Sequence, residues 1–105
     1  MPPRPHRGEV WLSDLGLAAK VRPCLVLTDA PADNELALFT VVHHTTATQG
    51  NPWELKIAKY FLKAGAFHFQ QINTISAPRL IRCLGSLNDA EMVQVQSMLR
   101  LRLGF

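Results

Sequence analysis

The stretch Arg22-Pro23-Cys24-Leu25-Val26-Leu27 sets the interpretation of this chain of 105 residues. Cys24 to Leu27 is an unbroken apolar run, which is typical of a β-strand buried on both faces. Proline donates no hydrogen bond to a sheet, so Pro23 belongs at the first position of this strand or on an edge. Arg22 is then expected at the mouth of a buried strand. There its planar guanidinium either reaches an anion such as a phosphate or simply ends the strand in water.

Further short strands are predicted on both sides of this stretch. Upstream, residues 8–12 alternate between apolar and polar side chains, and downstream, residues 36–42 are rich in strand-forming residues. Glycine, proline and polar residues mark the connections between strands. The other predicted strands cover residues 54–57, 65–69, 71–75 and 81–84, and the predicted connections cover 13–21, 28–35, 43–53 and 76–80.

The end of the chain changes from strand to helix periodicity. Met92, Val95 and Leu99 recur at helical spacing, and the stripe continues to Leu103. Asn88 and Glu91 have the spacing of a capping box, and Gly104 is a natural helix stop. The pattern predicts a helix over residues 89–103.

Many short strands followed by one helix predict a mainly β fold, either a small SH3-like barrel or a twisted antiparallel sheet, with the C-terminal helix covering it. The length suits a single domain, which we place at residues 8–105. Residues 1–7 contain three prolines and two arginines and are expected to form a flexible tail.

The composition limits the classes of function. The net charge of +3 and the pI of about 9.2 permit an RNA partner without requiring one. No apolar run has the roughly 20 residues of a membrane span, and the start lacks a signal peptide, so a cytoplasmic protein with no membrane partner is expected. Cys24 and Cys83 are expected to be buried thiols. Because Cys and His lack metal-site spacing, neither a metal nor another cofactor is predicted.

A polar cluster, His44-Thr45-Thr46, follows the predicted strand 36–42. Paired strands would bring it to the same edge of the sheet as Arg22. Threonine hydroxyls can donate to phosphate oxygens, and a histidine can transfer protons near neutral pH. Because neighbouring residues of a strand point to opposite faces, only one of His43 and His44 can face a shared site. The plain alternative is that the threonines are ordinary strand formers.

The order of these motifs resembles the MazF/PemK (Kid-like) family of toxin endoribonucleases. The resemblance is carried by five pieces in order: Arg7-Gly8-Glu9-Val10-Trp11-Leu12; Arg22-Pro23 with its apolar strand; His44-Thr45-Thr46; Gly50-Asn51-Pro52-Trp53-Glu54; and Gln71-Ile72-Asn73-Thr74-Ile75. Leu84-Gly85-Ser86-Leu87 and the final helix resemble the family's ending. Two departures are visible: the segment before Arg22 is shorter than in many members, and histidines replace a Pro-x pair before the threonines.

The resemblance implies a CcdB/PemK-like fold, a homodimer and a cognate antitoxin peptide as partner. It also implies metal-independent cleavage of single-stranded RNA to 2′,3′-cyclic phosphate and 5′-hydroxyl ends. The family's catalytic arginine and threonine carry over to Arg22 and Thr45, and Gln71 falls on a glutamine near the family's site. To these we add His44 as a proton-transfer group, and Thr46 and Lys20 as substrate-binding groups.

Two other functions remain compatible with the sequence. One is a non-catalytic interaction protein, since relatives of this fold include a toxin that poisons DNA gyrase. The other is a member that only binds RNA. The first of these would not need Arg22 together with Thr45. Incubation of the protein with a mixed RNA pool in EDTA separates both alternatives from the nuclease.

Overall fold

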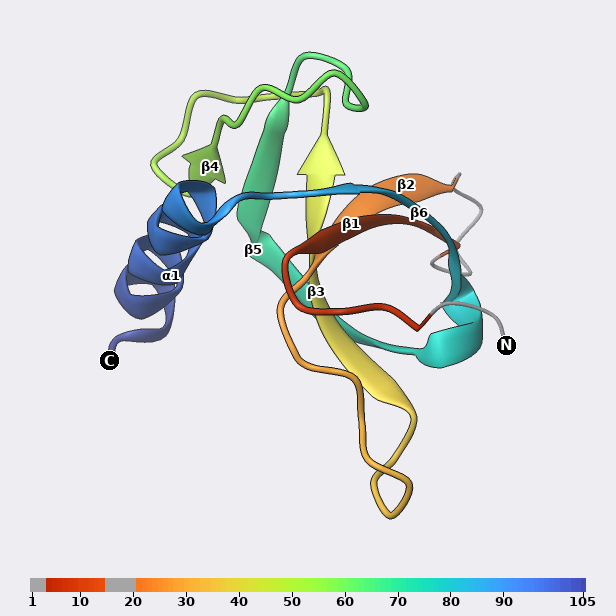
Figure 1. Ribbon diagram of the computed structural model, residues 1–105. Coiled ribbons are helices and arrows are strands. Elements are labelled where there is room, and N and C mark those ends of the chain that lie inside the picture. Colours follow the sequence, from red (N-terminus) through yellow and green to blue (C-terminus); the bar gives the residue numbers. More distant parts are fainter. Residues whose placement is uncertain (1–3, 15–20) are drawn as a thin grey trace.

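The computed structural model describes residues 4–14 and 21–105. Within these, six strands precede one helix (Figure 1). The strands are β1 (Glu9–Ser13), β2 (Arg22–Val26), β3 (Leu38–Thr45), β4 (Glu54–Leu55), β5 (Ala66–Ser76) and β6 (Leu80–Ser86), and the helix is α1 (Asp89–Leu103). A single 3-10 turn, Ala77–Arg79, joins β5 to β6.

The strands form one antiparallel sheet in the order β4-β5-β3-β2-β1-β6. The sheet twists and curls strongly (Figure 1). Although β6 is the next strand after β5 in the chain, it pairs with β1 and forms the edge of the sheet opposite β4. Among the described residues β4 and β6 each pair on one side only, so the sheet does not close into a barrel. Of the two architectures expected, the twisted antiparallel sheet is the one observed.

Two apolar cores lie on the two sides of the sheet. The larger one lies between the sheet and α1 and is built around residues such as Leu25, Val42 and Phe67. The smaller one contains Trp11 and Cys24. Alternate residues of β2 enter different cores, which explains why its sequence is apolar without interruption.

The helix begins and ends as predicted. The side chain of Asn88 accepts the Glu91 N–H at 2.8 Å, and Glu91 Oε1 accepts the Asn88 N–H at 2.8 Å, which completes the capping box. Gly104 ends the helix in the left-handed conformation with φ of 80°. Met92 and Val95 are buried and Leu99 packs partly buried against the same core, whereas Leu103 is 58% exposed, so the predicted apolar stripe packs as far as Leu99 and not at its end.

Two predicted boundaries were wrong near the site. The segment 43–53 was expected to be a loop, but β3 continues through Thr45 because His44 and Thr45 pair with Phe67 and Ala66 of β5. Residues 65–69 and 71–75, expected as two strands, form the single strand β5, which is irregular where it passes His43. Both differences depend on pairing between segments far apart in the sequence.

The two cysteines were both expected to be buried thiols. Both are free, but only Cys24 is buried; the prediction is wrong for Cys83, which is exposed on the edge strand β6.

The segment before β1 contacts the fold. Pro5 is buried, and Glu9 Oε1 accepts the His6 N–H at 2.7 Å. The domain boundary at residue 7 stays a prediction. Within residues 4–14 and 21–105, no helix has the length and apolar character needed to cross a membrane.

Candidate active site

The start of β2 and the end of β3 open into a pocket of about 540 Å³, which we call the Arg22 pocket. It brings together four residues that the sequence singled out separately: Arg22, His44, Thr45 and Thr46. The remaining lining residues are Leu12, Val21, Pro23, Phe61, Lys63 and Leu84. The cationic side chains of Arg22 and Lys63, one imidazole and two hydroxyls thus share one cleft with apolar side chains.

The backbone of Arg22 is fixed by its neighbour strand. Ser13 lies opposite Arg22 in the β1–β2 pair, is fully buried, and its hydroxyl donates to the Arg22 carbonyl oxygen at 2.8 Å. Burial raises the pKa of the Cys24 thiol to about 11, so the thiol keeps its proton and can donate to Ser13 Oγ, 2.8 Å away. This buried chain of hydrogen bonds holds the strand end that presents the guanidinium.

The two histidines take different places, as the alternation of strand residues predicts. His44 lines the Arg22 pocket, is 4% exposed and packs edge-on against Phe67 with 5.0 Å between ring centroids. Burial lowers the pKa of His44, so its imidazole is neutral at pH 7 and able to accept a proton. His43 does not line the pocket. Its pKa is lowered by burial and, second, by the charge of Arg22.

Thr45 is held with its donor hydrogen available. Its Oγ1 accepts the N–H of Ala47 at 3.0 Å, and because a hydroxyl is both donor and acceptor, the O–H can still donate elsewhere. Gly65 lies directly against this residue, since a Cβ at position 65 would collide with the Thr45 carbonyl oxygen and come within 3.0 Å of His44 Cε1. Only glycine permits this close approach of the two backbones.

The segment 56–65 supplies two pocket residues that the sequence reasoning missed, Phe61 and Lys63. The Phe61 ring lies against Gly85 of β6, where a side chain of any size would collide with it. Lys59 Nζ lies 2.6 Å from Glu91 Oε1 of α1 and ties the same segment to the helix. The grouping of Lys56, Lys59 and Lys63 in the sequence was the available signal, but it does not say which strand ends the group adjoins.

The turn Gly50-Asn51-Pro52-Trp53-Glu54 closes the loop that carries Thr46. The Glu54 carboxylate accepts the N–H groups of Gln49 at 2.6 Å and Gly50 at 2.8 Å, and the bond from Gln49 is the largest cause of its lowered pKa. The guanidinium of Arg102 stacks 4.9 Å above the Trp53 ring and joins this turn to α1. The carboxylate is therefore occupied with its own loop.

Gln71, a predicted substrate-binding residue, is not among the described residues that line the pocket. It is exposed on β5, and its role stays a prediction. Lys20 lies outside the described residues. In the part of the chain that the structure describes, no three His, Cys, Asp or Glu side chains come together as a candidate metal site.

Comparison with known proteins connects this chain to one family. The family model of the PemK-like, MazF-like toxin of type II toxin-antitoxin systems matches residues 6–103. A mycobacterial endoribonuclease solved in complex with its cognate antitoxin is 25% identical with a TM-score of 0.81, and the match covers 96% of each chain. No curated protein matches the chain.

Two further solved structures share the fold. A MazE-MazF complex from Deinococcus radiodurans has a TM-score of 0.80 at 21% identity, over 98% of both chains. The Mycobacterium tuberculosis toxin MazF-mt6 has a TM-score of 0.77 at 22% identity, over 92% of this chain and 97% of that one. At this identity the likeness concerns the architecture alone.

Proposed function

Because the chain belongs to the PemK-like, MazF-like family of type II toxins, we propose that it is an endoribonuclease that cleaves single-stranded RNA. The observation that carries the proposal is the Arg22 pocket, in which Arg22, His44 and Thr45 surround one space large enough for a phosphodiester. The mycobacterial relative at 25% identity is described as an endoribonuclease, which supports the same activity here.

The reaction is an internal transesterification. The 2′-oxygen of a ribose attacks the adjacent phosphorus, the bond from phosphorus to the 5′-oxygen breaks, and the products carry a 2′,3′-cyclic phosphate and a 5′-hydroxyl. Negative charge develops on the non-bridging oxygens. The Arg22 guanidinium and the Thr45 hydroxyl donate hydrogen bonds to these oxygens and stabilise the transition state. Since the nucleophile belongs to the RNA itself, the reaction needs no metal-bound water.

Proton transfer is assigned to His44. Its neutral imidazole accepts the proton of the 2′-hydroxyl as the new bond to phosphorus forms, and the leaving 5′-oxygen takes its proton from water. The permanent charge of Arg22 makes it unsuitable as a base. His43 lies outside the pocket lining and has no part in this step.

The proposal extends to two protein partners. One is an antitoxin peptide, because the mycobacterial relative was solved with its cognate antitoxin. The other is a second copy of the chain. The outer side and end of α1 expose large apolar side chains, which a homodimer would bury: Val93, Leu101, Leu103 and Phe105.

The decisive experiment incubates the purified protein with a mixed RNA pool in EDTA and sequences the cut ends. We expect cuts at defined sites with 5′-hydroxyl and 2′,3′-cyclic phosphate ends. An uncut pool would overturn the nuclease assignment, and RNA binding without cuts would leave the RNA-binding alternative. Cleavage that requires added divalent metal would overturn the mechanism.

A further inference from the structure

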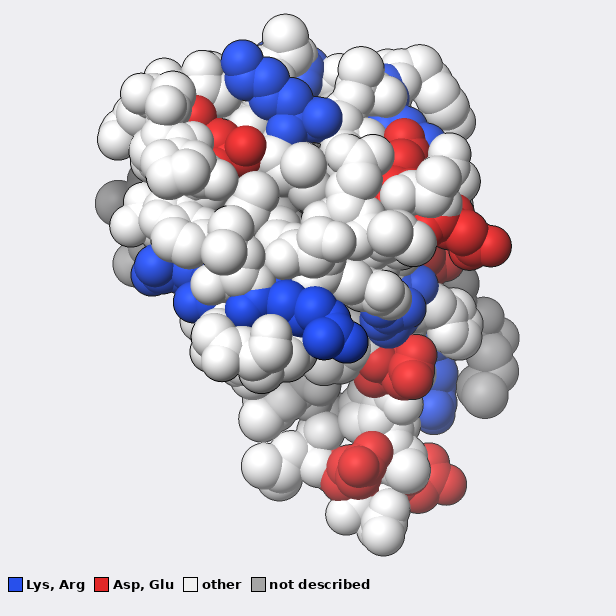
Figure 2. Space-filling model, turned by 90° about the vertical axis from the view of Figure 1, so that its left-hand side faces the viewer, with Lys and Arg blue, Asp and Glu red and all other residues white. Residues whose placement is uncertain are grey.

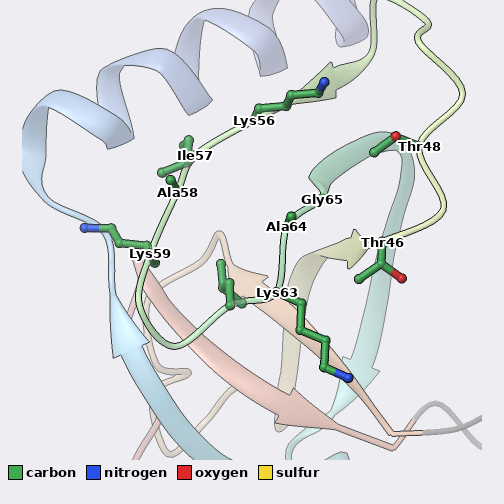
Figure 3. A pocket seen from close by; sticks show the side chains of 10 residues that line it. Thr46, Thr48, Lys56, Ile57, Ala58, Lys59, Lys63, Ala64 and Gly65 are labelled. Carbon is green, nitrogen blue, oxygen red and sulfur yellow. The ribbon is translucent and has the colours of Figure 1, made fainter.

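A second pocket, of about 700 Å³, adjoins the Arg22 pocket. It lies between the loop after β3 and the segment 56–65 (Figure 3). Thr46 and Lys63 line both pockets, so the two form one continuous groove. We call the second one the lysine pocket, since Lys56, Lys59 and Lys63 line it and none of its described lining residues is acidic. Its other lining residues are Thr48, Ile57, Ala58, Leu62, Ala64 and Gly65.

The three lysines differ in what they can bind. Lys59 turns away from the pocket towards the helix, where it pairs with Glu91 (Figure 3). Lys56 and Lys63 are exposed, and neither forms an ion pair with the described residues. The pocket thus presents two positive charges that are available to an anion, and Thr46 and Thr48 add hydroxyl groups on the opposite wall.

The wider surface carries positive charge in more than one place. Figure 2 shows Lys and Arg side chains at the top of the face that carries α1 and in a band across its middle. Acidic side chains lie beside the upper group, along the right-hand edge and at the bottom of this face. Within the groove itself, none of the described residues that line the two pockets is acidic, so an anionic strand that runs from the Arg22 pocket into the lysine pocket meets positive charge rather than repulsion.

We propose that the lysine pocket binds the RNA backbone beside the cleaved bond and holds the phosphate of a neighbouring nucleotide between Lys56 and Lys63. The inference rests on the proposed function. A volume of about 700 Å³ lies within the roughly 300–1,000 Å³ of pockets that hold small organic ligands, so a nucleotide fits and the space exceeds the needs of a lone ion. Proteins that bind single-stranded nucleic acid track the backbone with such positively charged grooves.

The residues that line both pockets indicate the order in which the lysines contact the RNA strand. Lys63 reaches both pockets, so it lies between the reacting phosphate and the next one. Lys56 lines only the lysine pocket and contacts the more distant phosphate. Lysine suits this task because its ammonium acts as a point charge on a flexible stem, which tolerates variation in the path of the strand.

The test measures how binding of a 2′-O-methyl RNA of mixed sequence, which cannot be cleaved, depends on salt. For a single strand, each neutralised phosphate contributes about 0.7 to the slope of log affinity against log salt. We expect Lys56→Gln to reduce the slope by about 0.7 and Lys56→Gln with Lys63→Gln to reduce it by about 1.4. Arg7→Gln removes the same charge from an exposed residue outside both pockets and should leave the slope unchanged.

Several outcomes would overturn the lysine pocket as an RNA subsite. One is an equal slope for wild type and the double variant while the wild type still cleaves RNA, and in that case the proposed nuclease stands. Another is weaker binding of a polyglutamate peptide to the lysine variants with unchanged RNA binding, which would assign the pocket to an acidic protein segment. If the wild type binds RNA with the expected slopes but cleaves none, the subsite stands and the proposed nuclease fails.

Discussion

The Arg22 pocket and the lysine pocket share two residues and are built in opposite ways. In the first, the groups assigned to chemistry come from paired strands, and His44 and Thr45 are 4% and 8% exposed. In the second, the charges come from the segment 56–65, and both Lys56 and Lys63 are exposed. The segment is attached to the fold through Ile57, which is buried in the larger core, through Phe61 against Gly85 and through the Lys59–Glu91 ion pair.

The difference matches the two tasks. Stabilising a transition state requires donors held within a fraction of an ångström, which backbone pairing and burial provide. Holding the backbone of a flexible strand requires charge near the right place and tolerance of different paths, which exposed lysines provide. Substitutions in the Arg22 pocket should therefore act on rate, and those in the lysine pocket on affinity and its salt dependence.

The largest effect is expected at Arg22. Arg22→Ala should fold and reduce the cleavage rate by on the order of 10²–10³, because a donor aimed at transition-state charge is lost. Single-turnover cleavage at saturating protein measures this, with circular dichroism to check the fold. Arg7→Gln is the control for loss of charge alone. A folded Arg22→Ala protein that cleaves RNA at the wild-type rate would show that the Arg22 pocket does not catalyse the cleavage.

The next effect concerns His44 and pH. Its pKa is lowered by burial, so the base form is present at neutral pH and is lost only as pH falls through that lowered pKa. The wild-type rate should therefore fall on the acid side, below the usual titration range of histidine. His44→Gln should lower the plateau by about 10² and remove this limb. His43→Gln, which changes a residue outside the pocket lining, should keep the limb; an identical profile in all three proteins would rule out His44 as the base.

A third variant tests how tightly the two pockets are joined. Gly65→Ala places a Cβ against the Thr45 carbonyl and His44 Cε1, so either the segment 56–65 or the end of β3 must shift. We expect a stability loss of about 1–3 kcal/mol, typical of overpacking, together with slower cleavage. Urea unfolding gives the free energy, and Ala64→Ser at the exposed neighbouring position is the control. Unchanged stability and rate would mean that the close approach at Gly65 is unimportant.

The smallest effect is expected at Lys59. Its ion pair with Glu91 joins the lysine pocket to α1, and pairs of this kind are worth at most about 1 kcal/mol. Lys59→Gln should lower the free energy of unfolding by no more than that, and the loss should shrink at high salt. Lys56→Gln, which breaks no ion pair, is the matched control. A loss of several kcal/mol, independent of salt, would show that the segment is anchored as firmly as the strands.

Some features followed from local sequence alone. The bounds of α1 could be predicted because Asn88, Glu91 and Gly104 act within one helical turn of themselves. The apolar run after Arg22 identified β2 because burial on both faces leaves a continuous apolar pattern. The opposite placement of His43 and His44 followed from the alternation of side chains along a strand.

Other features depended on contacts between distant segments. The extension of β3 to Thr45 and the merging of two predicted strands into β5 arise from the β3–β5 pairing. The strand propensities of single residues carry no information about that pairing. Cys83 lies on the edge strand β6 and is exposed, although its local sequence is apolar. Phe61 and Lys63 enter the site because the segment 56–65 folds back over the ends of β2 and β3.

The sequence by itself determined the chemical types available: an arginine before a buried strand, hydroxyls and an imidazole after the next one, and a group of lysines later. The tertiary structure alone decided which of them share a space. It placed His44 in the pocket lining and left His43 and Gln71 out of it, and it joined the lysines to the site through Thr46 and Lys63. The physical reason is that the type of each side chain is fixed by its own position in the sequence, whereas the distance between two side chains is set by the pairing and packing of strands far apart in the chain.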